Sequence, residues 1–165
     1  MSTVAVVGNP KPNSRTRAAA EAVLERLTDA PPELVIDVVD LGAGLLGWGD
    51  PAVAEAVAAV TAAEVVVVAS PTYKATYTGL LKLFLDQIGT GDLAGVVAVP
   101  LMLGGGPAHA LAPDLLLKPV LVELGATTPT RGLYLIDRSW DDPKLLDPWL
   151  AAARPQVAAT RGLGR

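Results

Sequence analysis

Basic and hydroxyl side chains cluster near the N-terminus, directly after the apolar segment Thr3–Val7. Residues 8–17 read Gly-Asn-Pro-Lys-Pro-Asn-Ser-Arg-Thr-Arg, and no acidic residue occurs before Glu21. Backbone N–H groups at a helix start bind anions, and nearby hydroxyls and cations strengthen that binding. Three basic residues at a helix N-terminus oppose the helix dipole unless an anion compensates them. The segment therefore predicts a phosphate site, although Ser14 alone also fits an ordinary helix cap.

The pattern of this loop narrows the kind of phosphate. The loop has neither the Gly-Lys-Ser/Thr ending of a triphosphate-binding loop nor a dinucleotide pattern, so we expect the phosphate of a mononucleotide. A formal G-x-G-x-x-G pattern at Gly42–Gly47 follows the second apolar segment and runs into Trp48–Pro51 without opening a helix directly. We interpret that pattern as a flexible loop.

Two of the three tyrosines, Tyr73 and Tyr77, lie in the segment 70–79 that follows the apolar run Val65–Ala69. Tyrosine offers a rigid apolar face with a polar tip, and exposed N–H groups in a turn begun by Pro71 suit the carbonyl acceptors of a ring. The segment therefore predicts a site for a flat ligand. The alternative is that each tyrosine simply packs under the loop.

A third candidate loop contains three consecutive glycines, Gly104, Gly105 and Gly106, shortly before His109. Glycines permit a close approach between the backbone and a ligand edge. We interpret His109 as a binding residue rather than a proton donor. A serine hydrolase built on Ser70 and His109 is poorly supported, because Ser70 lacks the sequence of a nucleophile elbow.

Composition removes several kinds of chemistry. The 165-residue chain has no cysteine and a single histidine, which excludes disulfides, iron–sulfur clusters held by thiolates, Cys/His zinc sites and cysteine nucleophiles. A formal net charge of −4 offers no broad basic surface for nucleic acid or anionic lipid. The longest uncharged stretch, Leu93–Pro113, is broken by prolines and glycines, so we expect no membrane span. No signal-peptide pattern occurs, and we expect a cytoplasmic protein.

Five apolar segments of strand length alternate with five helical segments. The predicted strands are Thr3–Val7, Leu34–Val39, Val65–Ala69, Val96–Leu103 and Leu133–Ile136. The predicted helices are Ser14–Thr28, Pro51–Ala62, Thr78–Ile88, Pro107–Leu124 and Pro143–Ala159. This alternation predicts an α/β fold with a parallel sheet in the order 2-1-3-4-5 and helices on both faces. We expect one domain over 1–165, with 161–165 as a flexible tail.

In such a sheet a ligand binds beyond the carboxyl ends of the strands, where the strand order reverses. The loops after strands one, three and four lie there, and these are the three loops singled out above. The predicted fourth helix is apolar nearly all round between Leu115 and Val122, which predicts burial in a homo-oligomer interface around Leu115–Leu121. Pro119 should kink that helix.

The three loops resemble those of the NAD(P)H-dependent FMN reductase family, especially its sulfonate-assimilation branch. The resemblance covers nearly the whole chain. Its specific parts are Gly8–Lys11 with Ser14-Arg15, then Pro71–Lys82, and finally Gly104-Gly105, Ala108–Leu111 and Leu117–Leu121.

The resemblance implies a flavodoxin-like three-layer sandwich that binds FMN and either NADPH or NADH. The FMN phosphate would be held by Asn9, Lys11, Ser14, Arg15 and Thr16. The flavin ring would lie against Pro71, Thr72, Tyr73 and Lys74, with Gly104, Gly105, Gly106 and His109 at another edge. No metal and no catalytic side chain is implied, because the cofactors carry the hydride transfer.

The family supplies reduced flavin to flavin-dependent monooxygenases, which makes such an enzyme the expected partner. Three positions depart from the family pattern: Asn9 replaces a usual Ser, Lys11 replaces a usual Arg, and Leu115 replaces an aromatic residue linked to flavin release. The third departure leaves open a quinone or azo reductase with retained FMN. A non-catalytic flavodoxin-like electron carrier is the other alternative.

Overall fold

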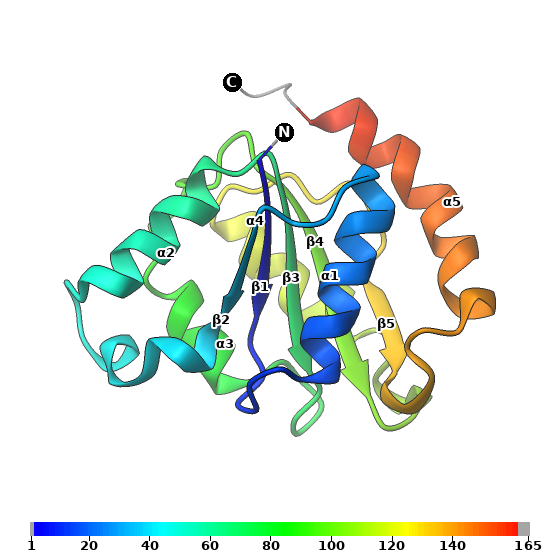
Figure 1. The fold of residues 1–165 in the computed structure, drawn as a ribbon, viewed down its shortest axis with the longest axis horizontal. Helices are drawn as coiled ribbons and strands as arrows, with labels where there is room; N and C mark the ends of the chain where they lie inside the picture. Colours follow the sequence, from blue (N-terminus) through cyan, green and yellow to red (C-terminus); the bar gives the residue numbers. More distant parts are fainter. Residues whose placement is uncertain (1, 162–165) are drawn as a thin grey trace.

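The computed structural model describes residues 2–161. The predicted tail at 161–165 therefore lies outside the described residues, apart from Arg161. Five parallel strands form one sheet in the order β2-β1-β3-β4-β5, as the sequence predicts (Figure 1). The strands are β1 (Thr3–Val7), β2 (Leu34–Asp37), β3 (Val65–Pro71), β4 (Val97–Gly104) and β5 (Leu133–Ile136).

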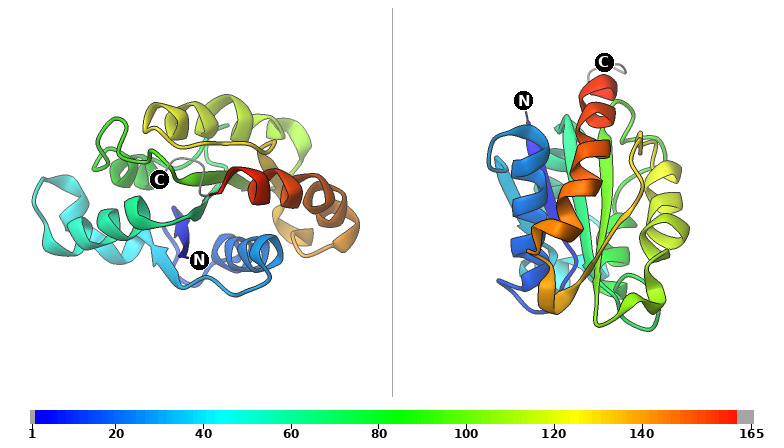
Figure 2. Two further views of the ribbon diagram at one scale, coloured as in Figure 1. Left: turned by 90° about the horizontal axis from the view of Figure 1, so that it is seen from above. Right: turned by 90° about the vertical axis from the view of Figure 1, so that its right-hand side faces the viewer.

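The α-helices are α1 (Arg15–Thr28), α2 (Pro51–Ala62), α3 (Gly79–Leu85), α4 (Lys118–Glu123) and α5 (Pro143–Thr160). The shorter helical segments are η1 (Val38–Leu46), η2 (Pro107–His109), η3 (Pro113–Leu117) and η4 (Asp137–Ser139). Helices α1 and α5 cover one face of the sheet, and α2, α3 and α4 cover the other (Figure 2). The three-layer arrangement is the predicted one.

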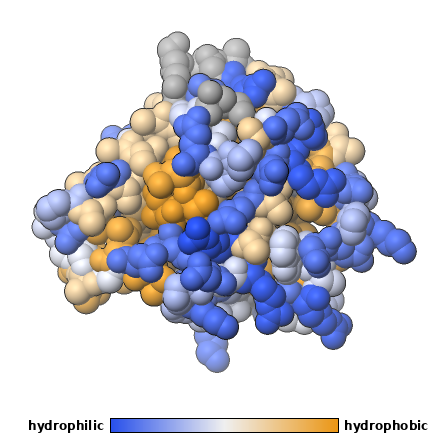
Figure 3. All heavy atoms as spheres, in the orientation of Figure 1, coloured by the Kyte–Doolittle hydropathy of each residue, from blue (hydrophilic) through white to orange (hydrophobic). Residues whose placement is uncertain are grey.

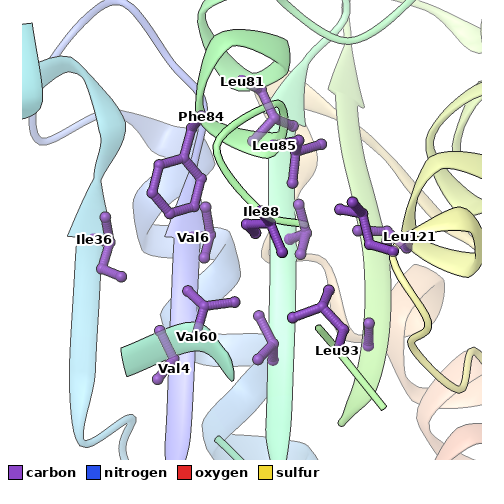
Figure 4. Close-up of a cluster of buried hydrophobic side chains, with 14 of the residues drawn as sticks. Val4, Val6, Ile36, Val60, Leu81, Phe84, Leu85, Ile88, Leu93 and Leu121 are labelled. Carbon is purple, nitrogen blue, oxygen red and sulfur yellow. The ribbon is translucent and has the colours of Figure 1, made fainter. Parts of the chain in front are cut away.

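Each strand is buried on both faces, which explains why its sequence is continuously apolar. In β1 the side chains of Val4 and Val6 belong to the core under α2, α3 and α4, whereas Ala5 and Val7 belong to the core under α1 and α5. Phe84 of α3 is fully buried and packs toward Val6 (Figure 4). Burying an aromatic side chain of this size stabilises the fold by about 2–3 kcal/mol.

Four helices begin where the sequence places a capping side chain, and Asp142 caps α5 in the same way as the three described next. Ser14 caps α1 by accepting from the N–H of Arg17, Asp50 caps α2, and Thr78 caps α3 by accepting from the N–H of Leu81. Each cap satisfies backbone donors that a helix start leaves without a partner. The predicted bounds of β1, α2 and β5 are confirmed without change.

The prediction of one helix over Pro107–Leu124 is wrong. The segment is divided into the 3-10 turn η2, the π-helical turn η3 and the short helix α4. Pro113 and Pro119 each lie in the first turn of their segments, where a missing N–H costs no helical hydrogen bond. The kink expected at Pro119 is thus replaced by a change of helix type just before it.

Several other bounds differ from the sequence prediction. The second strand ends at Asp37 instead of Val39, β3 extends to Pro71, β4 is shifted by one residue, and α3 is shorter than predicted, while α1 and α5 each differ by one residue. The segment η1 covers most of the glycine-rich stretch 42–47, for which the sequence predicts a flexible loop. Gly42 interrupts η1 with a positive φ of 52°, which glycine adopts without strain. The pattern therefore follows β2 without entering a helix N-terminus of the dinucleotide kind.

The outer surface is unevenly polar. Hydrophilic residues gather over α1 and α5, and apolar residues gather near β2 and α2 (Figure 3). Within residues 2–161, no helix combines the length and apolar character needed to cross a membrane.

Candidate functional site

The three loops singled out from the sequence lie at one edge of the sheet. Strands β1, β3 and β4 are neighbours in register, with Val7 opposite Ala69 and Pro71 opposite Leu103. Because the strands are parallel, their carboxyl ends open on the same side. The loops that follow β1, β3 and β4 therefore meet there (Figure 1).

The loop after β1 presents backbone donors at the start of α1. The N–H groups of Ser14, Arg15 and Thr16 donate to no acceptor among the described residues. These groups lie in the first turn of a 14-residue helix, where the dipole is positive. An anion placed there receives several N–H donors at once.

Side chains of the same loop fix its shape. The Asn9 side-chain amide donates to the Thr16 hydroxyl at 2.9 Å, and the backbone N–H of Lys11 donates to the side-chain Oδ1 of Asn9 at 2.9 Å. Asn13 adopts a left-handed φ of 52°, and its N–H donates to the buried carboxylate of Asp37 at 3.2 Å. The loop is thus held open by its own polar groups and by the end of β2.

The three basic residues of the loop differ in availability. Arg17 binds Glu21 at 2.8 Å and Asp37 at 3.4 Å, and the hydrogen bond to Glu21 is the largest cause that raises the pKa of Arg17. Arg15 pairs with Asp137 at 3.0 Å. Lys11 is exposed and has no ion pair within the described part of the chain. Lys11 is the cation best placed to meet a bound anion.

The loops after β1 and β3 are joined by a buried hydroxyl pair. Thr78 donates to the Gly8 carbonyl at 2.6 Å, and its own N–H donates to the Ser70 hydroxyl at 3.0 Å. Ser70 is fully buried and donates to the Pro71 carbonyl at 2.8 Å. Its hydroxyl is thus a structural link, which argues against the hydrolase alternative.

The loop after β3 is a tight two-residue hairpin. Tyr73 and Thr76 exchange backbone hydrogen bonds of 2.8 and 3.2 Å. Between them, Lys74 and Ala75 both adopt positive φ, at 50° and 69°. Non-glycine residues in this conformation cost about 1–3 kcal/mol each and concentrate at functional sites. The turn leaves Tyr73 and Lys74 exposed at the site edge.

The three glycines after β4 have two different environments. A Cβ atom on Gly105 or Gly106 would meet nothing within 4 Å, whereas a Cβ on Gly104 would lie 1.8 Å from the Tyr134 hydroxyl oxygen. Gly105 and Gly106 therefore border open space, and the ligand contacts expected at these two glycines stay a prediction. Gly104 leaves room for Tyr134 instead. Sequence reasoning missed Tyr134, whose signal was a lone tyrosine inside the otherwise aliphatic strand β5.

A cavity of about 470 Å³ lies beside these glycines, lined by residues from three elements. Thr72, Gly104–His109 and Tyr134 form its walls. A second cavity of about 450 Å³ shares the Pro107–His109 turn and adds Ala75 and Leu115. His109 is exposed between the two cavities and lines both.

The site residues fit the two ends of FMN. The helix start, Lys11 and the hydroxyls of Ser14 and Thr16 suit a phosphate dianion. The open glycines and exposed hairpin suit a flat ring, and the Thr72 hydroxyl is buried without a hydrogen-bond partner among the described residues. A buried hydroxyl without a partner costs free energy that a ligand acceptor or donor would recover. The same described residues hold no cluster of three His, Cys, Asp or Glu side chains suited to a metal ion.

Comparison with known proteins decides the family. The model of the NADPH-dependent FMN reductase family matches residues 1–141. The chain belongs to this family. The match spans all three site loops and extends through β5.

Several members of the family are similar over most of their length. An FMN reductase (NADPH) from Pseudomonas aeruginosa is 34% identical, covering 96% of this chain and 88% of the relative. An NADH-dependent FMN reductase from Pseudomonas putida is 31% identical, covering 88% of this chain and 82% of the relative. Among solved structures, the apo form of an NADH:FMN oxidoreductase is 34% identical with a TM-score of 0.87, covering 98% of this chain and 90% of that chain.

Proposed function

We propose that this chain reduces FMN with NADPH or NADH. The family match and the three adjoining loops at the carboxyl edge of the sheet support this function together. FMN, when bound, supplies a ring that accepts a hydride at N5 from C4 of the nicotinamide. The protein contributes binding and orientation, and no side-chain acid is required.

The phosphate end of FMN is assigned to Asn9, Lys11, Ser14, Arg15 and Thr16. Asn9 acts through its hydrogen bonds to Thr16 and to the Lys11 N–H, which shape the loop. The ring end is assigned to Pro71, Thr72, Tyr73, Lys74, Gly105, Gly106 and His109. Gly104, the last residue of β4, lines the same cavity. The exposed Lys11 beside the start of α1 at one end, and the open glycines with the exposed hairpin at the other, support this orientation.

The test is the rate of NADPH and NADH oxidation by dialysed protein as FMN is added from zero. A rate that is absent without FMN and saturates with it is the expected result, and it makes FMN a substrate that leaves the protein. A rate already present with a quinone alone would instead indicate retained FMN and a quinone reductase. No oxidation under either condition would refute the reductase and leave an electron carrier.

We further propose a homodimer or homotetramer that uses the apolar surface around η3 and α4. Leu115 is 65% exposed and Val122 is 53% exposed. Leu121, in contrast, is fully buried in the chain's own core, so the contact rests on its neighbours. The surface adjoins the cavity lined by Ala75 and His109, so a second copy seated there would cover the site.

Replacing Leu115 and Val122 by glutamate tests this contact, with Leu145→Glu on α5 as an exposed control. We expect the first variant to sediment as a smaller species and the control to sediment like the unmodified protein. An unchanged oligomer in the first variant would refute the interface.

The reduced flavin would serve a flavin-dependent monooxygenase in the cytoplasm, where reduced nicotinamide nucleotides are available. The names of the relatives state reduction of FMN, whose product is the reduced flavin that such an enzyme consumes. Coupled turnover with a monooxygenase in the same mixture tests it. Product formation that depends on this chain supports the partnership, and its absence argues against it.

A further inference from the structure

We propose that Tyr134 is a positioning residue for the flavin ring. Its hydroxyl holds the Gly104–Gly106 segment in the shape that receives the ring, and Gly104 is glycine so that the phenol can pass. The inference rests on the proposed function, because it assigns a role within that flavin site.

The geometry ties Tyr134 to both ends of the glycine segment. The Tyr134 hydroxyl donates to the Gly106 carbonyl at 2.9 Å. On its way it crosses the α-carbon of Gly104, where an added Cβ would lie 1.8 Å from the hydroxyl oxygen and 2.7 Å from Cζ. Contacts under 3.0 Å do not occur for real Cβ atoms, so any side chain at Gly104 would displace the phenol.

The hydrogen bond fixes a segment that has few other restraints. The N–H groups of Gly105 and Gly106 have no acceptor within residues 2–161. Glycine backbones are also the most flexible, because they lack a Cβ. The Tyr134 hydroxyl is therefore the contact that sets the direction of the Gly106 peptide beside the cavity of about 470 Å³.

Tyr134 also has a packing role, and the two roles are separable. Its ring is half-buried and packs against the core under α2, α3 and α4. Phenylalanine retains that packing and removes only the hydroxyl. A loss of flavin affinity in Tyr134→Phe without a change in melting temperature would thus report positioning.

The experiment measures the Kd of FMN and of riboflavin, which lacks the phosphate, for the unmodified chain and for Tyr134→Phe. We expect both Kd values to rise by the same factor, about three- to tenfold for one hydrogen bond. The visible absorption bands of bound flavin should shift as well. Unchanged Kd values, or a loss confined to FMN, would overturn the proposal.

Substitutions at Gly104 supply an independent second test. Gly104→Ala should lower flavin affinity at least as much as Tyr134→Phe, because the methyl group displaces the phenol. Gly104→Ala should also lower the melting temperature, because the methyl group meets the phenol. The double variant with Tyr134→Val removes that clash, so it should recover the melting temperature but not the flavin affinity. Normal flavin binding by Gly104→Ala would overturn the pairing.

A failure of the proposed function has a different signature. In that case the unmodified chain binds neither flavin and oxidises no NAD(P)H with FMN, which also removes the basis of the Tyr134 assignment. If the unmodified chain binds flavin and the variants bind it with the same Kd, the Tyr134 assignment alone is wrong.

Discussion

The loop after β1 and the loop after β4 line the same edge of the sheet but are held in opposite ways. The first is fixed by its own side chains Asn9 and Ser14 and by Asp37 at the end of β2, which accepts from the Asn13 N–H. The second has no polar side chain over Gly104–Gly106, and its shape depends on Tyr134 from a neighbouring strand. A locally restrained loop suits a compact anion, whereas an open backbone segment suits the edge of a flat ring.

The difference shows which parts of the chain determine the binding of each end of the ligand. In the loop after β1, which we call the anion loop, all the side chains proposed to bind phosphate lie within ten consecutive residues, 8–17. The loop after β4, which we call the ring loop, offers open space and backbone groups to a ligand. Its conformation is fixed by Tyr134 of β5, about 30 residues later in the chain. Substitutions in the first loop should therefore change phosphate recognition, and those around the second should change ring recognition.

Among substitutions in the two loops, we expect the largest loss of stability at Gly8, the first residue after β1. A Cβ there would lie 2.4 Å from the Leu81 Cβ, so Gly8→Ala must move β1 away from α3. We expect a loss of about 3 kcal/mol in the free energy of unfolding, measured by denaturant titration.

Gly105→Ala is the matched control, because its Cβ would enter open space. It should leave the free energy of unfolding nearly unchanged and weaken flavin binding. Equal stability of the two variants would contradict the close packing at Gly8.

A smaller effect is expected at Asp37, which supports the anion loop from β2. Asp37→Ala leaves the Asn13 N–H and one side of Arg17 without their partner. We expect a loss of about 2 kcal/mol in stability and a higher Kd for FMN. Asp40→Ala, at an exposed site three residues later, is the control and should change neither quantity. A stability like that of the control would show that Asp37 does not restrain the loop.

The smallest effect on stability is expected at Thr72. Its hydroxyl is buried without a hydrogen-bond partner in the described residues, so Thr72→Val should leave the melting temperature unchanged or slightly higher. The Kd of both flavins should rise about threefold if the ligand supplies the missing partner. A lower melting temperature with unchanged flavin binding would mean that the hydroxyl serves the fold instead.

The sequence predicts the fold and the anion loop better than the ring loop, for physical reasons. Strands buried on both faces and helix caps such as Ser14 and Thr78 are local signals, so the alternation of strands and helices and the approximate place of most elements follow from them. The break of the fourth helix into η2, η3 and α4 is accompanied by tertiary hydrogen bonds of Asp114 and Lys118 with the segment before β5, which no local pattern reveals. The link from Tyr134 to Gly106 joins β5 to the loop after β4 and leaves no local pattern.

The ratio of riboflavin Kd to FMN Kd tests the two-ended site most directly. The measurement compares the unmodified chain with the double variant Lys11→Ala and Ser14→Ala. The account predicts that FMN binding weakens about a hundredfold while riboflavin binding changes by about twofold or less, because only FMN carries the phosphate. Equal losses for the two flavins would contradict the assignment of the phosphate to the loop after β1.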